Sequence, residues 1–392
     1  MRIAVSGAGV VTSIGIGVGD NMSSLSSCRS GISPSSELLH TVHKLPVGEI
    51  HLTNSELSAM LGLPDSSHLS RTALLGMMAA KEALEDAALK KGLRVGIVSA
   101  TSVGGMDLTE RFFEDYMKDP SSGRLRDVRM HDCAASTKAI AEYCGIKSYS
   151  TTISTACSSA ANAIMFGARL IRHGLVDCVV AGGTDALSVF TLNGFKSLMI
   201  LDEEPCRPFD ETRKGLNLGE GAGYVVLQRE DTLEKEPYCY LSGYANCNDA
   251  YHQTASSASG DGGYLAMKAA LDMAGVSPEA VSYVNVHGTG TGNNDASEGA
   301  ALRRLFGDSV PKFSSTKGFT GHTLAAAGGI EAVFSVMAVN KGYIYPNLRF
   351  GTPISDLGLV PETSFTESGR LEHVLTNSFG FGGNCTSLLF SI

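Results

Sequence analysis

Residues 154–174 read STACSSAANAIMFGARLIRHG, and residues 315–342 read STKGFTGHTLAAAGGIEAVFSVMAVNKG. Both segments open with Ser-Thr, pass a chemically reactive side chain, enter a helix rich in Ala and Gly, and end at a basic residue followed by Gly. When the two helices are laid over one another, Cys157 falls opposite His322. The shared outline predicts a fold built by duplication, with both helix starts pointing into one cleft between the halves.

Short apolar runs recur along the chain between helical patterns. Most are rich in β-branched residues, do not alternate, and end at glycine, which is typical of strands buried on both faces. The runs begin at Ile3, Val95, Val176, Ala222, Val281 and His373, and helical patterns cover residues 71–89, 261–275 and 298–307. This alternation predicts an α/β layered fold. No low-complexity linker separates the halves, so we expect them to pack as one unit.

The composition is that of a globular protein. The chain has 392 residues, of which 43% are apolar and 18% charged. With 31 Lys and Arg against 40 Asp and Glu and no basic run, we expect neither a nucleic-acid nor a membrane partner, and an acidic partner would need a local basic patch. The nine scattered cysteines lack a CxxC pair, which argues for reduced thiols rather than disulfides or a zinc site.

The N-terminus has no charged region followed by a long apolar run, so it does not read as a secretory signal. No apolar run reaches the roughly 18 residues that span a bilayer. We therefore expect a soluble cytoplasmic protein.

Cys157 lies at the predicted start of a buried helix, among small and hydroxylated residues. Small or apolar residues cover every face of this helix, which predicts a central position. A helix N-terminus carries about half a positive charge and unpaired N–H groups, which lower a thiol pKa and can hold the oxygen of a thioester under attack. On this segment alone, a small core residue explains Cys157 equally well.

His287 follows a buried-type strand in VNVHGTGTGNNDASE, a loop without bulky side chains that could admit a substrate. Thr289 and Thr291 offer hydroxyls at alternate positions of an extended segment and so on one side of it.

His322 lies in KGFTGHTLAAAGGIEA, between Lys317 and Glu331. Either histidine alone is better explained as structural, but their joint occurrence with Cys157 in such settings favours an active site. Phosphate-binding, HExxH, GxSxG and EF-hand motifs are absent, and GAGVVT near the N-terminus lacks the acidic residue of a nicotinamide site.

Together these motifs resemble the β-ketoacyl-[acyl carrier protein] synthases of the thiolase superfamily, of the elongating condensing type. Four motifs occur in the family's order and at comparable spacing: STACSSA, HGTGT, KGFTGHTLAAAG and NSFGFGG. Three more segments also agree with the family's sequences: AGGTDA, RPFDETRKGLNLGEGAG and NDAYH. The resemblance runs essentially end to end. It implies a five-layered αβαβα fold with internal duplication, in which residues 1–235 carry the nucleophilic Cys and residues 236–392 the two His.

The resemblance also implies a ping-pong reaction, a decarboxylative Claisen condensation. Cys157 would take an acyl chain from the phosphopantetheine arm of an acyl carrier protein. Malonyl carrier protein would then lose carbon dioxide while His287 and His322 donate hydrogen bonds to the enolate oxygen. No metal and no cofactor of the protein's own is implied, because the phosphopantetheine belongs to the carrier protein substrate.

Further residues receive roles by the same resemblance. Lys317 and Glu331 would support the histidine pair, and Thr289 and Thr291 would hold the pantetheine arm. Phe381 would be a gating ring whose N–H joins that of Cys157 in the oxyanion hole, and Phe379 would lie beside it. Three acidic residues would be structural: Asp295, Glu298 and Glu220.

Two departures and several alternatives stay open at this point. Leu216 replaces a Phe common in relatives, and TGNND replaces a Thr-Pro pattern, so the preferred chain length is undetermined. Cys385 invites a thiolase interpretation on coenzyme A thioesters, although we expect it to be a small residue leading into the last strand. We expect a homodimer, with a heterodimer of synthase and chain-length factor as the alternative. Fatty-acid and polyketide or polyene pathways fit equally well.

Overall fold

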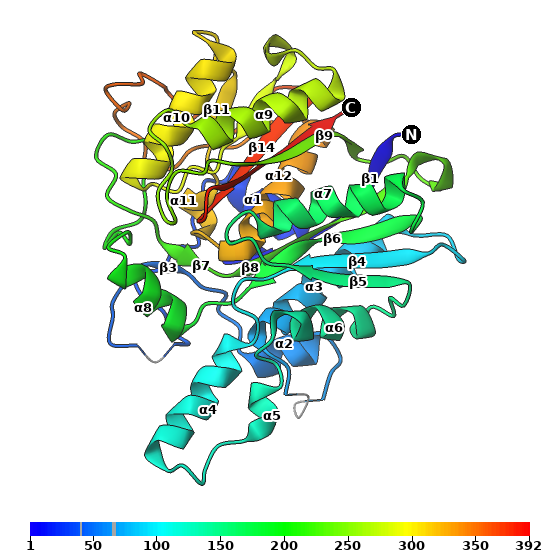
Figure 1. Cartoon of the computed structure of the whole chain (residues 1–392), viewed down its shortest axis with the longest axis vertical. Helices are drawn as coiled ribbons and strands as arrows, with labels where there is room; N and C mark the ends of the chain where they lie inside the picture. The colour runs from blue at the N-terminus through cyan, green and yellow to red at the C-terminus, as the bar shows by residue number, and fades with distance from the viewer. Residues whose placement is uncertain (40, 65–67) are drawn as a thin grey trace.

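Two five-stranded sheets with the same strand order form the framework of the computed structural model, which describes residues 1–39, 41–64 and 68–392 (Figure 1). The first sheet has the order β5-β4-β6-β8-β1 and the second the order β11-β10-β14-β15-β9. In each sheet the first three strands are parallel and the last two run antiparallel to their neighbours. The shared order confirms the predicted duplication.

The strands of the first sheet are β1 (Ile3–Thr12), β4 (Val95–Ala100), β5 (Tyr149–Ile153), β6 (Cys178–Asp185) and β8 (Gly221–Arg229). Those of the second are β9 (Cys239–Asn248), β10 (Tyr283–Asn285), β11 (Lys312–Ser314), β14 (His373–Gly380) and β15 (Asn384–Ser391).

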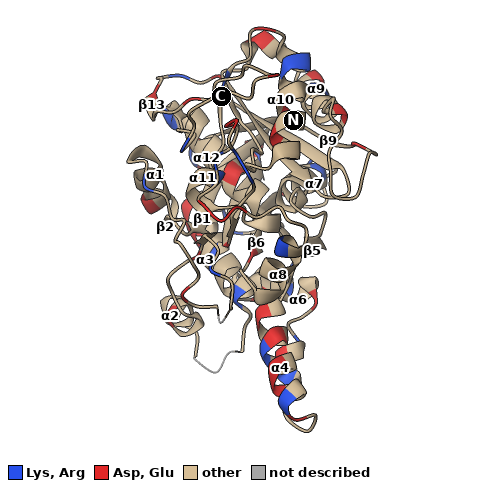
Figure 2. Ribbon diagram, turned by 90° about the vertical axis from the view of Figure 1, so that its left-hand side faces the viewer, with Lys and Arg blue, Asp and Glu red and all other residues tan. Residues whose placement is uncertain are grey.

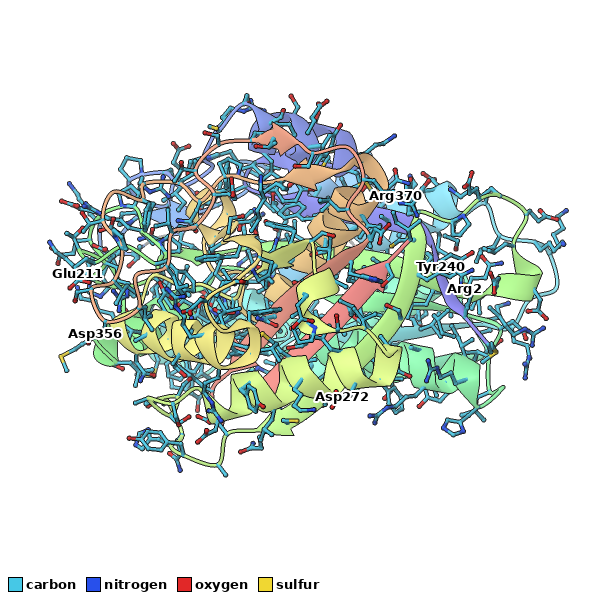
Figure 3. All side chains as sticks on the ribbon, turned by 90° about the horizontal axis from the view of Figure 1, so that it is seen from above. Arg2, Glu211, Tyr240, Asp272, Asp356 and Arg370 are labelled. Carbon is cyan, nitrogen blue, oxygen red and sulfur yellow. The ribbon has the colours of Figure 1, made fainter. Side chains whose placement is uncertain are left out.

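The edges of the two sheets meet where β1 pairs with β9, at Ala4 with Tyr240 and Val5 with Cys239. The Arg2 guanidinium lies 3.3 Å from the centroid of the Tyr240 ring at this junction. Figure 3 labels both residues. This pairing makes one continuous sheet, to which β2 (Gly15–Ile16) adds by pairing with β1.

Helices lie in three layers around the two sheets (Figure 1). The outer layers are α3 (Arg71–Ala87) with α6 (Cys133–Tyr143) on the first sheet, and α9 (Asp261–Ala274) with α10 (Gly292–Phe306) on the second. The central layer holds α7 (Ser159–Arg172) and α12 (Ala327–Lys341). This arrangement is the predicted αβαβα fold.

The two central helices approach closely because their facing residues are small. A Cβ atom at Gly328 would lie 2.9 Å from the Ala161 N, and one at Gly329 would lie 2.3 Å from the Gly223 O. Larger residues there would force the helices and strand β8 apart. The AAAGG stretch is therefore required by the close packing of the duplicated core.

The structure corrects the register of the duplication. Helices α7 and α12 begin at Ser159 and Ala327, and the residues three positions earlier, Ala156 and Leu324, both have φ of 53°. A non-glycine residue with positive φ is uncommon, so the coincidence fixes the alignment. Cys157 is thus equivalent to Ala325 and not to His322, because the superposition by sequence was three residues out.

Helix α12 also corrects the expectation about apolar runs. The segment Leu324–Lys341 has the length and hydropathy of a membrane span, but 89% of it is buried inside the protein. It is the core helix of the fold.

The remaining elements are short or peripheral. They are α1 (Val18–Ser26), α2 (Asn54–Met60), α4 (Met106–Lys118), α5 (Leu125–Val128), α8 (Val189–Ser197), α11 (Lys317–Thr320), and the paired strands β3 (Val47–Gly48) with β7 (Leu218–Gly219) and β12 (Tyr343–Ile344) with β13 (Thr366–Glu367). Helix α4 projects from the body and carries acidic and basic side chains together (Figure 2).

Candidate active site

Cys157, His287 and His322 converge at the centre of the fold. One thiol or ring-nitrogen atom from each lies within 4.8 Å of the others, and all three residues are buried. Cys157 lies two residues before α7, His287 two residues after β10, and His322 between α11 and a 3-10 turn, Leu324–Ala326. The structure thus brings together the three residues that the sequence singled out.

The turn that carries Cys157 is fixed from both sides. The Asn384 Oδ1 accepts hydrogen bonds from the Ser158 Oγ (2.7 Å) and the Asn162 Nδ2 (2.8 Å), which ties the start of α7 to β15. On the other side, a Cβ atom at Gly380 would lie 2.9 Å from the Thr155 O. Glycine at this position therefore allows the loop after β14 to approach the cysteine.

The backbone N–H groups of Phe381 and of Cys157 itself lie near the sulfur, where both act to lower the pKa of the thiol. A thioester carbon bonded to this sulfur would place its oxygen near the same donors. The pair is the arrangement that an oxyanion hole requires.

Burial raises the pKa of the Cys157 thiol to about 11, while the charge of Lys317 and the Phe381 N–H act in the opposite direction. The lowered pKa expected from a helix start is therefore wrong, because desolvation of the thiolate outweighs the nearby donors. At neutral pH the sulfur is a thiol.

The hydrogen-bond partners of the histidine rings determine which nitrogen carries the proton. The Leu324 N–H donates to the His322 Nδ1 (3.2 Å), and the Lys317 ammonium, which can only donate, lies 3.3 Å from the His287 Nδ1. In both rings the proton is thereby assigned to Nε2. Each ring thus has one N–H donor left for a ligand, and the two ring centroids lie 5.3 Å apart.

Both rings are neutral. Burial lowers the pKa of His287 well below its ordinary value, and the charges of Lys317 and His322 lower it further. Burial and Lys317 do the same to the pKa of His322. A neutral imidazole has no positive charge with which to stabilise the enolate that forms when carbon dioxide leaves. It can, however, donate a hydrogen bond to the developing oxyanion.

One cysteine and two histidines also form a donor set that zinc uses. A histidine that binds a metal through Nε2 carries its proton on Nδ1 and donates it outward. Here both Nδ1 atoms accept hydrogen bonds, so the residues do not fit a metal ion.

Lys317 and Glu331 lie behind His287, as a buried ion pair between α11 and α12. The Lys317 Nζ also donates to the His287 O at 2.6 Å. Burial raises the pKa of Glu331 to about 7, and Lys317 opposes this shift. The ammonium is held in place by groups from two elements and fixes the histidine ring.

Two acidic residues of α10 hold the loop of His287. Glu298 accepts the N–H groups of His287 (2.9 Å) and Gly288 (2.8 Å), and burial raises its pKa to about 7. Asp295 accepts the N–H groups of Gly290 (3.2 Å) and Phe209 (2.8 Å). Neither lies among the lining residues of the cavities described below, so both position the loop.

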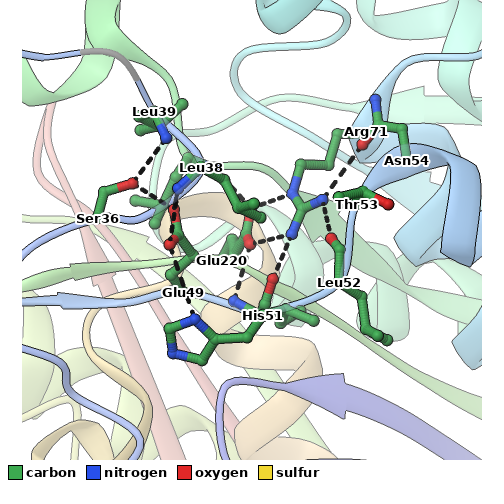
Figure 4. A network of polar contacts seen from close by, with 12 residues as sticks. Ser36, Leu38, Leu39, Glu49, His51, Leu52, Thr53, Asn54, Arg71 and Glu220 are labelled. Atoms are coloured by element: carbon green, nitrogen blue, oxygen red, sulfur yellow. Dashed lines mark hydrogen bonds and ion pairs between the residues drawn. The ribbon is translucent and has the colours of Figure 1, made fainter.

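Glu220 belongs to a separate network, shown in Figure 4. It accepts the Arg71 Nε (2.8 Å) and Nη2 (2.6 Å) and the N–H groups of Ile50 and Leu187. This buried ion pair joins the end of β7 to the first residue of α3, and the Ile50 N–H ties the segment after β3 to the same carboxylate.

Two cavities reach Cys157. The first, of about 190 Å³, is lined by both histidines, Thr289, Thr291, Phe379, Leu216 and Lys214, among others. The second, of about 380 Å³, is apolar and is lined by Ala156, Leu324, Ser102, Val103, Phe190 and Leu198, among others. The rings of Phe195 and Phe381 line both cavities and stack at 5.9 Å between centroids.

Several of these residues carry no signal in the sequence. Leu324 acts through its backbone N–H and positive φ, Asn384 through tertiary contacts, and Phe195 through a stack with a distant residue. Cys385, the alternative nucleophile or base, lies in β15 and packs against Cys247, Phe379 and Ala266. A Cβ at Gly262 would lie 2.8 Å from its sulfur, so the site requires small neighbours and Cys385 is a packing residue.

Comparisons with known proteins agree with this geometry. Residues 1–232 match the family model "Beta-ketoacyl synthase, N-terminal domain" and residues 238–351 match "Beta-ketoacyl synthase, C-terminal domain". The chain is 31% identical to 3-oxoacyl-[acyl-carrier-protein] synthase 2 of Staphylococcus aureus (strain MRSA252), over 100% of this chain and 98% of the relative.

Two solved structures show the same fold. The ishigamide ketosynthase/chain length factor superposes with a TM-score of 0.92 at 28% identity, covering 100% of this chain and 98% of the other. A type II polyketide synthase acyl-carrier protein in complex with its ketosynthase bound to the hexaketide gives a TM-score of 0.89 at 26% identity, covering 100% and 99%.

The chain therefore belongs to the β-ketoacyl synthase family, as the motifs indicated. It is an acyltransferase of the condensing class. This result favours the condensing interpretation over the thiolase alternative.

Proposed function

We propose that the chain condenses an acyl group held on Cys157 with malonyl-[acyl carrier protein] and releases 3-oxoacyl-[acyl carrier protein] in fatty-acid or polyketide biosynthesis. The observation that carries this proposal is the placement of two neutral histidines, each with its proton on Nε2, beside a buried thiol. Donors aimed at one oxygen suit enolate formation better than general-base chemistry.

In the first half-reaction the Cys157 thiol attacks the thioester of an acyl carrier protein. The N–H groups of Cys157 and Phe381 hold the oxygen while it carries negative charge. The S–C bond to the pantetheine arm breaks, and its sulfur takes up the proton that the cysteine gives up. Because a thiol replaces a thiol, this step needs no net base, which suits a cysteine that is protonated at rest.

In the second half-reaction the malonyl thioester oxygen accepts hydrogen bonds from the Nε2 atoms of His287 and His322. The malonyl C–C bond breaks, carbon dioxide leaves, and the electron pair forms the enolate. The enolate carbon attacks the acyl carbon, the bond to Cys157 breaks, and the sulfur takes one proton from water. The acyl chain has grown by two carbons.

The two cavities divide the substrates. The pantetheine arm would enter the cavity of Thr289 and Thr291, where exposed Lys214 can face its phosphate. The acyl chain would occupy the apolar cavity, with the ring of Phe381 between them. Leu216 lines the first cavity, so the departure noted in the sequence borders the substrate.

An acyl carrier protein is the proposed partner, supported by the neighbour whose structure includes a carrier protein. We propose a homodimer in the cytoplasm, without nucleic acid, membrane, metal or resident cofactor. A heterodimer with a chain-length factor is a second candidate, since a chain length factor is named with another neighbour.

Reconstitution tests the proposed function. The purified protein is incubated with an acyl carrier protein loaded with a short acyl chain and with malonyl carrier protein, and products are followed by intact mass. We expect 3-oxoacyl carrier protein and one carbon dioxide for each product. Condensation of two acetyl-coenzyme A molecules without a malonyl donor would contradict the proposal and support a thiolase. A mass-resolved complex of two copies distinguishes the homodimer from a synthase that needs a different subunit.

A further inference from the structure

Asp185, the last residue of β6, is fully buried and contacts both the loop after β4 and the turn before α12. Its Oδ1 accepts the Thr101 hydroxyl (2.5 Å) and the Ser102 N–H (3.1 Å). Its Oδ2 accepts the Ser102 hydroxyl (2.6 Å) and the Ala325 N–H (2.8 Å). One side chain of the first half thus binds a loop of its own half and the turn of the other half.

Both ends of this bridge reach the active site. Ser102 lines the apolar cavity beside Cys157. Ala325 follows Leu324, which lines the same cavity and donates its N–H to the His322 Nδ1. A shift of the Ala325 backbone would therefore move the donor that sets the His322 tautomer.

The stabilising partners of Asp185 are hydroxyl and backbone N–H groups. An amide in its place has one oxygen that accepts and one nitrogen that only donates. With asparagine, the nitrogen would face the N–H of Ala325 or the donors of Ser102, so at least one buried hydrogen bond would be lost.

We propose that Asp185 is a positioning residue for condensation, which holds the wall of the apolar cavity and the turn that orients His322 in one fixed relation. The inference rests on the proposed function, in which His322 donates to the enolate oxygen. It adds that the orientation of His322 is set from the half of the protein that carries the nucleophile.

A double-mutant cycle on malonyl decarboxylation tests this role. We expect Asp185→Asn to lower kcat about tenfold or more with less than a twofold change in KM for malonyl carrier protein, because alignment and not binding is lost. In a His322→Ala background the same change should cost less than twofold, since the group that it orients is gone. In a His287→Ala background the tenfold loss should persist.

Equal losses in the wild-type and His322→Ala backgrounds would overturn the positioning role, because Asp185 would then act independently of His322. An unchanged rate in the His322→Ala variant alone would instead overturn the proposed function of His322, and the inference with it. The matched control is Asp210→Asn, a buried aspartate that accepts the N–H groups of Gly351 (2.6 Å) and Thr352 (2.9 Å). It should stay within twofold of the wild type.

A second variant covers the case in which Asp185→Asn does not fold. Ser102→Ala keeps the carboxylate and removes one hydroxyl donor from the bridge. We expect the same pattern at smaller amplitude, roughly threefold in the wild-type background and none with His322→Ala. An equal threefold loss in both backgrounds, or no loss in either, would again overturn the role.

Discussion

The turns that precede α7 and α12 share a backbone and differ in chemistry. Ala156 and Leu324 have the same φ of 53° at equivalent positions, and both line the apolar cavity. The first turn continues into Cys157, whereas the second continues into Ala325 and places His322 before it. A duplicated backbone thus delivers a nucleophile from one copy and a hydrogen-bond donor from the other. We therefore assign the two halves to separate steps of one reaction, with acyl transfer on the first turn and enolate stabilisation beside the second.

The largest effect is expected from removing the nucleophile, which separates the activity of the first turn from that of the second. In Cys157→Ala we expect condensation to fall below detection, because no acyl-enzyme can form. Malonyl decarboxylation should stay measurable, because both histidines remain. Product and carbon dioxide are measured in the same reaction. Loss of both activities in a folded variant would show that the turns do not act separately.

The next largest effect is expected from removing either histidine donor, which allows the two donors to be compared. His287→Ala and His322→Ala should each lower malonyl decarboxylation by about two to three orders of magnitude, the cost of losing one oxyanion donor. Exposed His131→Ala serves as the control and should match the wild type. A tenfold or smaller loss in either active-site variant would count against its role as a donor.

A pH series tests whether burial or the helix N-terminus determines the pKa of Cys157 in the first turn. Because burial raises the pKa of Cys157 to about 11, its thiolate fraction should increase with pH up to that value. The rate of alkylation of Cys157 by iodoacetamide, mapped by peptide mass, should therefore increase about tenfold per pH unit between pH 7 and pH 10. A rate that is flat above pH 7 would indicate a lowered pKa and a dominant helix start.

The smallest effect concerns the cavity that both turns line. Val103→Phe should fill part of this apolar cavity and lower kcat/KM for long acyl chains about tenfold, with acetyl unaffected. Val42→Phe, at a position that is 91% exposed, is the matched control. Equal losses for all chain lengths would place the acyl chain elsewhere.

Much of the fold follows from local sequence. The six apolar runs all became strands, and the helices expected over residues 71–89 and 261–275 are α3 and α9 within two residues. The last strand, β15, is expected after Cys385 and begins at Asn384. The sequence patterns do not predict strands β5, β9 and β11, because their polar or mixed residues give no continuous apolar run. Helix α10 begins at Gly292, earlier than its apolar pattern suggests, because Thr291 caps it.

The site was predictable where a motif carries it and unpredictable where tertiary contacts do. Cys157 and the two histidines lie in recognisable loops, and the structure brings them together. The correct register of the duplication depends on the positive φ of Ala156 and Leu324. Neither alanine nor leucine predicts a positive φ from its residue type. The pKa of Cys157 depends on burial by distant segments, so reasoning from the helix start alone gave the wrong direction.

Mapping of the acylated residue tests the central claim most directly. The protein is incubated with acyl carrier protein alone, digested, and searched by mass for the acyl group, with Cys157→Ala as the control. We predict a single acyl group on Cys157 and none in the variant. An acyl group on another cysteine, such as Cys385, would contradict the division of roles between the two halves.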